Sequence, residues 1–346
     1  YRAQKRGGRG KLATATKEDD WIDQLFIANT HEYILCFSNR GRLYWLKVWE
    51  VPTGSRGSRG RPIVNMFPLQ EDEKITVVLP LPGEASRFPE DCYTFMATAK
   101  GTVKKTALSE FSNPRKAGII AVGLDDGDYL IGAALTDGSH DVMLFSDGGK
   151  AVRFDETDVR PMGRNARGVR GMTLEEGQNV IAMLVSGGRQ AGEKTNEPTT
   201  RNSVLTTTEN GFGKRTLIDE YTRHGRGTKG MIAIQQSERN GKVVAATLVH
   251  DDDEIMLITN TGVLVRTRAI EIREMGRATQ GVTLIALDKG AQLIGLQRIV
   301  ENDASDYLAG SESNEGDEDG ESASAAEPAD NAPAPDTGSA DDSSAT

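Results

Sequence analysis

The sequence predicts an all-β, propeller-like fold of six blades. Three observations predict it: a tight turn containing glycine recurs between two apolar runs, a further apolar strand follows each turn, and amphipathic helical periodicity is absent from residues 31–300. Turns such as Asn-x-Gly and Asp-Gly are typical of β-hairpins, because glycine adopts the positive φ that they require. Radial repetition of small sheets leaves few exposed strand edges.

The turn glycines set the length of the repeat. They are Gly41, Gly101, Gly149, Gly211 and Gly262, with spacings of 60, 48, 62 and 51 residues. Ten positions after each of them the residue is apolar or aromatic: Val51, Phe111, Val159, Tyr221 and Ile272. A second glycine follows 19 positions after the turn, or 17 in the second repeat, at Gly60, Gly118, Gly168, Gly230 and Gly281. Each unit therefore has about four strands, the size of one blade.

Residues 1–30 fit the same pattern. Tyr1 and Gly10 are nine positions apart, as are Tyr221 and Gly230. We therefore predict one domain over residues 1–300. It has a partial first blade in residues 1–30, truncated at the N-terminus and without its leading hairpin, followed by five blades. The chain is expected to begin in the middle of a repeat.

The charge is distributed unevenly. Residues 301–346 contain 14 of the 51 acidic residues and no Lys or Arg, which leaves 37 acidic residues against 41 basic ones in residues 1–300, a net charge of +4. A mildly basic body with an acidic tail indicates polyanion binding and a means of regulating it. The tail's Ser, Ala, Glu, Asp and Pro composition predicts disorder. It is either a solubilising tether or a competitor for the basic surface.

Several kinds of site are not expected in this sequence. No apolar run approaches the roughly 20 residues of a membrane span, and the two cysteines form neither a disulfide framework nor a zinc motif. There is no phosphate-binding Gly-x-x-x-x-Gly-Lys-Ser/Thr loop, and the four histidines have no ligand spacing. We expect no catalytic residue, metal or cofactor in the chain, no membrane association and a cytoplasmic location.

Basic residues recur four positions after the turn glycine. They are Lys105, Arg153, Arg215 and Arg266, and the first repeat has Trp45 instead. If the blades are equivalent, each would carry one charge at the same position on the ring of blades. Regularly spaced cations can neutralise regularly spaced phosphates and release counterions. We interpret these residues as a basic track on the rim of the blades; the alternative is a solvated outer strand.

A second group of basic residues surrounds the later glycine of each repeat. The candidates for contacts with DNA in this group are Arg59, Arg167, Arg226 and Lys229. Glycine lets backbone N–H groups approach a phosphate, and the neighbouring cations supply charge. The alternative is that these segments of glycine and arginine only turn corners.

The first basic segment is the most specific. It consists of Gln4, Lys5, Arg6, Gly7, Gly8, Arg9 and Gly10. On composition alone it is similar to an RGG element of an RNA-binding tail, but within the repeat it closely resembles the seven-residue box of bacterial DNA gyrase A subunits. That family has Arg at the second position and Lys at the sixth, where this chain has Lys5 and Arg9, so both charges are retained. Residues 26–38 and 53–65 also resemble the family.

This resemblance, which covers residues 1–300, implies a β-pinwheel, a propeller-like domain in which blades exchange strands. It implies a non-catalytic domain that wraps duplex DNA with positive handedness and without sequence preference, so that an ATP-dependent type II topoisomerase introduces negative supercoils. The implied partners are DNA, the rest of the gyrase A subunit and the gyrase B subunit. The implied location is the bacterial nucleoid. The isolated domain is expected to be monomeric. Two other functions remain open: a topoisomerase IV-like domain that binds DNA without wrapping it, and a propeller that binds proteins.

Overall fold

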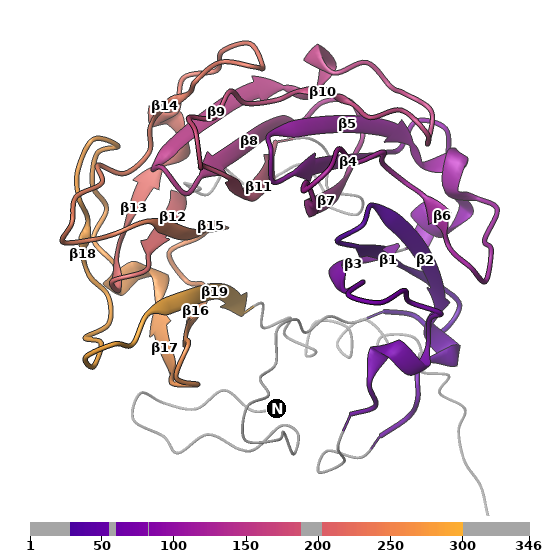
Figure 1. The fold of residues 1–346 in the computed structure, drawn as a ribbon, viewed down its shortest axis with the longest axis horizontal. Helices are drawn as coiled ribbons and strands as arrows, with labels where there is room; N and C mark the ends of the chain where they lie inside the picture. Colours follow the sequence, from indigo (N-terminus) through magenta and orange to yellow (C-terminus); the bar gives the residue numbers. More distant parts are fainter. Residues whose placement is uncertain (1–27, 55–59, 82, 188–202, 300–346) are drawn as a thin grey trace, which may run out of the picture. The chain divides into compact units, whose positions relative to one another are not determined.

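The computed structural model describes residues 28–54, 60–81, 83–187 and 203–299. They form five antiparallel sheets joined by turns and short 3-10 helices (Figure 1). Almost all of the expected partial first blade, and the acidic tail in residues 301–346, lie outside the described residues. No helix in the described segments has the length and apolar character needed to cross a membrane.

Each of the first four sheets has four strands, three of them from a single repeat. The first sheet has the order β3 (Ile75–Leu81), β1 (Tyr33–Ser38), β2 (Arg42–Lys47) and β6 (Ile119–Ile120). The second has β7 (Leu130–Thr136), β4 (Tyr93–Thr98), β5 (Thr102–Ala107) and β10 (Val169–Arg170). The third has β11 (Val180–Ser186), β8 (Asp141–Ser146), β9 (Lys150–Asp155) and β14 (Met231–Ile232). The fourth has β15 (Val243–Val249), β12 (Ser203–Thr208), β13 (Phe212–Leu217) and β18 (Val282–Thr283). The fifth has, within the described residues, β19 (Leu293–Ile299), β16 (Glu254–Thr259) and β17 (Leu264–Arg268).

A 3-10 helix follows the second hairpin strand of each repeat. These helices are η1 (Val48–Glu50), η4 (Leu108–Phe111), η5 (Glu156–Asp158), η6 (Ile218–Glu220) and η7 (Ala269–Glu271). Two more, η2 (Ile63–Asn65) and η3 (Gly83–Arg87), lie on either side of β3. Each helix of the first group ends at or just before the apolar residue ten positions after the turn glycine. Four of these five apolar residues are buried, so the helix turns the chain and directs that residue into the core.

The outermost strand of each four-stranded sheet comes from the following repeat. Strands β6, β10, β14 and β18 pair with β2, β5, β9 and β13, respectively. Hydrogen bonds to the carbonyl oxygen of the turn glycine fix the segment that carries the exchanged strand. The carbonyl oxygen of Gly149 accepts the N–H groups of Ala233 at 2.9 Å and Ile234 at 3.2 Å, and the same pair of bonds recurs at Gly41 and at two further turn glycines, Gly101 and Gly211. The predicted all-β, propeller-like fold is confirmed, with the exchange of strands that the resemblance implied.

The hydrophobic core lies between successive blades. One cluster joins Phe37 of the first sheet to Met96 and Phe111 of the second repeat, and another joins Phe95 of the second sheet to Phe154 of the third. The innermost strands contact one another in succession, β3 with β7, then β11, β15 and β19 (Figure 1). Because the third and fourth sheets each pack against a sheet on both sides, all six residues of β8 and of β12 are buried. This explains why the sequence has apolar runs instead of strict alternation.

Replacing Gly149 with alanine is expected to destabilise the fold by about 3 kcal/mol, since it combines a left-handed backbone with a steric clash. Gly149 has φ +74°, and a Cβ there would lie 2.6 Å from the carbonyl oxygen of Ile234. Gly177 has a similar φ of +76°, but a Cβ there would meet no atom within 4 Å. Gly177→Ala should therefore cost about 1–2 kcal/mol, for the backbone alone. Unfolding in urea measures both free energies; equal losses would show that the crossing at Gly149 contributes nothing.

Candidate nucleic-acid interface

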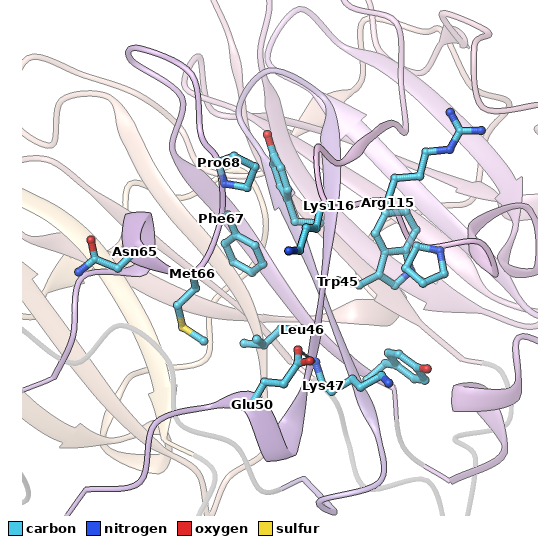
Figure 2. A pocket seen from close by; sticks show the side chains of 13 residues that line it. Trp45, Leu46, Lys47, Glu50, Asn65, Met66, Phe67, Pro68, Arg115 and Lys116 are labelled. Carbon is cyan, nitrogen blue, oxygen red and sulfur yellow. Dashed lines mark hydrogen bonds between the residues drawn. The ribbon is translucent and has the colours of Figure 1, made fainter.

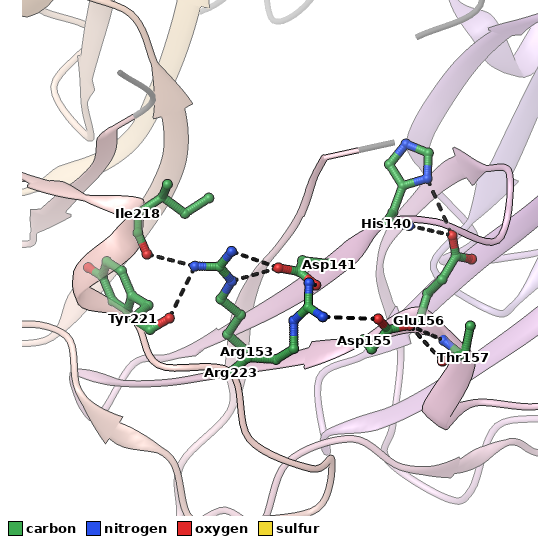
Figure 3. Close-up of polar contacts among 9 residues, drawn as sticks. All are labelled: His140, Asp141, Arg153, Asp155, Glu156, Thr157, Ile218, Tyr221 and Arg223. Carbon is green, nitrogen blue, oxygen red and sulfur yellow. Dashed lines mark hydrogen bonds and ion pairs between the residues drawn. The ribbon is translucent and has the colours of Figure 1, made fainter. Parts of the chain in front are cut away.

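Arg153, on β9, makes a contact between repeats (Figure 3). Its Nε and Nη2 bind Asp141 Oδ2 at 2.8 and 2.7 Å, while its Nη1 donates to the carbonyl oxygens of Ile218 at 2.8 Å and Tyr221 at 3.1 Å in the next repeat. Arg223 of that next repeat places its Nη2 2.6 Å from Asp141 Oδ1. The buried carboxylate of Asp141 therefore holds two arginines from successive repeats.

The contact made by Arg153 recurs in other blades. Trp45 Nε1 donates to the carbonyl oxygen of Phe111 at 2.9 Å, and Arg215 Nε donates to that of Ile272 at 2.8 Å. In each case the side chain four positions after one turn glycine reaches the residue ten positions after the next turn glycine. In these three blades the two regularities of the sequence are therefore the two ends of one hydrogen bond between blades. Trp and Arg both supply the long donor that this bond needs.

Lys105, on β5, belongs to a buried ion-pair group between the second and third repeats. Its Nζ lies 2.9 Å from Glu156 Oε2, and His140 Nδ1 lies 3.3 Å from Glu156 Oε1 and 3.0 Å from Asp137 Oδ1. Burial alone would raise the pKa of Glu156, but hydrogen bonds from His140 and Lys105 outweigh burial and lower it to about 2. Asp137, His140 and Glu156 offer metal-ligating atoms within 4.8 Å of one another. Because the Lys105 ammonium already holds Glu156, the group favours an internal ion pair over a bound metal ion.

These positions correct the expected exposed track. Lys105 and Arg215 are 3% and 6% exposed, and Arg153 is largely enclosed by its four polar contacts. Arg266 differs, because its side chain is half exposed and pairs with Glu254 on the neighbouring strand β16. Three of the four predicted rim residues therefore hold neighbouring repeats together. Contact between these residues and DNA stays a prediction.

Arg167, Arg226 and Lys229 are exposed, as a surface contact requires. All three lie in segments that lead into an exchanged strand: Arg167 before β10, and the other two before β14. Arg167 Nη1 lies 2.8 Å from Asp125 Oδ1, in a pair that is open to solvent. Arg226 uses Nε and Nη1 to bind two backbone carbonyl oxygens of the preceding repeat, at 3.0 and 3.1 Å. The segment that carries these cations is thus fixed while their charge remains accessible.

The glycines beside these cations have a steric role. Gly230 has φ +75°, and a Cβ there would lie 2.5 Å from the carbonyl oxygen of Ala151. At Gly281 the corresponding distance to the carbonyl oxygen of Gly213 is 2.7 Å. These glycines let the exchanged segment cross the outer strand of the preceding blade. The predicted role, close approach to a phosphate, is not needed to explain them.

The same segments carry further exposed cations. Arg115 and Lys116 belong to the predicted group around the second glycine of the repeat, and Arg160 and Arg273 were not predicted. All four lie between a 3-10 helix and an exchanged strand. Their position before the second glycine of the repeat was the signal that could have found Arg160 and Arg273. The predicted box, residues 4–10, and Arg59 lie outside the described residues, so their roles stay predictions.

A cavity of about 650 Å³ opens beside β2 in the first blade (Figure 2). Aromatic and apolar side chains form much of its lining, and Lys47, Arg115 and Lys116 add three cations to it. Glu50 is the acidic residue among the lining groups. This balance of charge favours an anionic ligand over a cationic one, and two of the cations belong to the exposed segment before β6.

The comparisons with known proteins agree with this architecture. A family model described as DNA gyrase C-terminal domain, beta-propeller matches residues 1–29, 32–82, 93–137, 140–186, 202–250 and 253–299. The DNA gyrase A subunit of Salmonella typhimurium is 53% identical over 322 residues, which cover 92% of this chain and 35% of the relative. The DNA gyrase A subunit of Escherichia coli K12 is 52% identical over 301 residues, which cover 87% of this chain and 33% of the relative. The chain thus spans about a third of the length of these relatives.

Two solved structures have a similar fold. The C-terminal domain of DNA gyrase A superimposes with a TM-score of 0.64 at 27% identity, covering 79% of this chain and 84% of that one. The C-terminal domain of DNA topoisomerase IV superimposes with a TM-score of 0.73 at 24% identity, covering 86% of this chain and 88% of that one. The second likeness concerns the fold alone.

Arg153→Met is expected to lower the free energy of unfolding by about 3 kcal/mol, because Asp141 loses one of its two arginines and the carbonyl of Tyr221 loses its donor. The carbonyl of Ile218 keeps the N–H of Tyr221 as a partner. Arg266→Met removes a half-exposed ion pair at the equivalent position of the last repeat and should cost less than about 1 kcal/mol. Urea denaturation of the two variants measures the difference. A loss for Arg153→Met as small as that for Arg266→Met would contradict the role assigned to Arg153.

Proposed function

The chain belongs to the DNA gyrase C-terminal domain family of β-propellers, and we propose that it binds duplex DNA without reading its sequence and wraps the duplex around its blades. One observation carries the proposal: exposed cations recur in the segments that cross from blade to blade. Arg167 and Arg226 are exposed there, with Lys229 close to the second. Phosphates are regularly spaced, so cations repeated from blade to blade can contact one curved backbone at several points.

Bending the duplex has a cost that these contacts must offset. Tight curvature over tens of base pairs costs on the order of several kcal/mol. Each neutralised phosphate releases counterions, so binding should weaken steeply as salt rises. The contacts of Arg153 with Asp141 and of Lys105 with Glu156 join successive repeats, which supports a stiff surface on which bent DNA could be held.

Within a whole gyrase the chain would be the accessory, non-catalytic part of an ATP-dependent type II topoisomerase. Wrapping with positive handedness would let the enzyme introduce negative supercoils. Its partners would be DNA, the rest of the gyrase A subunit and the gyrase B subunit. It would work in the bacterial cytoplasm, at the nucleoid, and the isolated domain would be a monomer. Residues 4–10 would hold the wrapped segment, and residues 301–346 would compete with DNA for the exposed cations.

A second candidate function is DNA binding without wrapping. The exposed cations at Arg167, Arg226 and Lys229 fit this function as well, because they can contact phosphates whether or not the duplex is bent. Against it stands the sequence identity of about one half with gyrase A subunits. A measurement of linking number separates the two functions.

Replacing Arg167, Arg226 and Lys229 with glutamine is expected to weaken DNA binding by about 10- to 100-fold at moderate salt, because three phosphate contacts are lost. The slope of log K against log salt should fall by up to about 3. When a nicked plasmid is sealed in the presence of the wild-type chain and the protein is then removed, we expect a positive shift in linking number. The triple variant should give a smaller shift at equal protein concentration.

The matched control removes the same charge elsewhere. Lys74→Gln, Lys242→Gln and Lys289→Gln change exposed lysines that precede the innermost strands β3, β15 and β19. This control should bind and wrap as the wild type does. Equal losses in both triple variants would show that net charge, and not placement, governs binding. Binding by the wild type without any shift in linking number would favour the second candidate function.

A further inference from the structure

Two lysines are fully buried beside the proposed surface. Lys104, on β5, and Lys214, on β13, are both 0% exposed. Lys104 Nζ donates to the carbonyl oxygen of Ala121 at 2.6 Å and to that of Arg164. Lys214 Nζ donates to the carbonyl oxygens of Gly276 at 2.6 Å and Arg277 at 2.5 Å. Among the described residues, neither ammonium group has a carboxylate within ion-pairing distance.

The fold does not require a cation at this position. Both lysines stand three residues after a turn glycine, where the other three blades have Tyr44, Val152 and Val265. Val152 is as well buried as the lysines, so an apolar side chain suits the site. Burying an ammonium group that is paired only with neutral carbonyls is costly. Two blades out of five nevertheless carry one, which points to a role beyond packing.

Three of the four acceptors of these lysines lie in the exposed basic segments, while the fourth, Ala121, is buried just after β6. Arg164 begins the segment that presents Arg167, and its carbonyl oxygen faces the Lys104 ammonium. Gly276 and Arg277 occupy the same place in the last repeat, and both of their carbonyl oxygens face Lys214. Each ammonium group therefore lies behind a segment whose outer side carries arginine.

We propose that Lys104 and Lys214 are positioning residues for DNA. Each buried ammonium group fixes the backbone of the basic segment in the next repeat and adds a positive charge behind the arginines that face the phosphates. A charge in a poorly solvated site is screened less than a surface charge, so it strengthens the potential at the segment above it. This inference rests on the proposed DNA binding.

The charge on both groups can be removed by pH. Burial lowers the pKa of Lys104 to about 8, with the nearby Arg164 acting in the same direction and Glu110 against it. Burial also lowers the pKa of Lys214 to about 8, opposed by Glu220 and assisted by Arg277. Ordinary lysines and arginines keep their charge up to pH 9, and ordinary histidines have lost theirs by pH 7.5. A rise from pH 7.5 to 9 therefore discharges the two buried lysines. The α-amino group of the chain also loses its charge in this range, and the pKa of His140 is raised, because burial, which lowers it, is outweighed by the hydrogen bond with Glu156 and the charge of Asp137. Replacing the two lysines separates their effect from that of these other groups.

The test is the affinity of the 346-residue chain for a short DNA duplex, measured by fluorescence anisotropy at constant salt from pH 7.5 to 9. We expect the wild type to lose about threefold to tenfold in affinity over this range, as cations near the phosphates are lost. The variant K104M/K214M should be weaker by a similar factor at pH 7.5 and nearly independent of pH. The control K100M/K242M, which removes two exposed lysines, should keep the wild-type dependence on pH.

Stability distinguishes this effect from unfolding. Between about pH 8 and 10.5 the unfolded chain binds protons that the folded chain has released, because the lysine pKa is 10.5 in the unfolded reference and about 8 in the fold. The contribution of these lysines to stability therefore rises with pH while DNA affinity falls. Thermal melts at each pH should show these opposite trends in the wild type.

The outcomes separate cleanly. Wild-type affinity that does not change with pH overturns this inference alone, and this result decides the question even if the double variant fails to fold. A folded K104M/K214M variant that keeps the wild-type pH dependence overturns it as well. If the wild type does not bind DNA at pH 7.5, the proposed function fails and this inference fails with it.

Discussion

The carbonyl oxygen of the turn glycine is the point on which the rest of the fold depends. In four blades it accepts two N–H groups from the next repeat, and a Cβ at the same residue would block the segment that donates them. The positive φ of the glycine is thus used twice, to close the hairpin and to expose its carbonyl to the neighbour. The exchanged strand and the exposed basic segment before it lie on the stretch of chain that crosses at this glycine. The interblade donor, such as Arg153, stands four residues after the glycine, on the strand that pairs with the exchanged one.

The blades could be predicted from the sequence because a hairpin turn is a local feature. Glycines such as Gly41 and Gly149, set between β-forming runs, predict a turn without knowledge of the rest of the chain. The exchanged strands could not be predicted in this way. Strands such as β6 and β14 are two residues long, and their partners lie in a different repeat. That part of the fold followed from the resemblance to a family, not from the residues.

The candidate site shows where periodicity stops being informative. Arg153 and Arg226 recur with the same repeat, so spacing alone gives them equal claims to a surface role. What separates them is the carboxylate of Asp141, which stands 12 positions from Arg153 and meets it only across a hairpin. Lys104 was missed for a related reason, because its acceptors are backbone carbonyl groups, one of them in the next repeat, that no sequence pattern marks. A periodic cation is reliable evidence of equivalent places, while its exposure depends on contacts that are formed only in the folded state.

The exchange of strands also affects how the chain is made. Arg42 in the first sheet pairs with Ile120, and Phe212 in the fourth pairs with Thr283, so a sheet is completed by residues that are translated long after its hairpin. Until the next repeat has been translated, the second hairpin strand of each new sheet is an additional unpaired edge, and an unpaired edge can pair with other chains. The lifetime of that edge is set by the speed of elongation. A codon-dependent pause between repeats would therefore prolong the interval in which the nascent chain can aggregate.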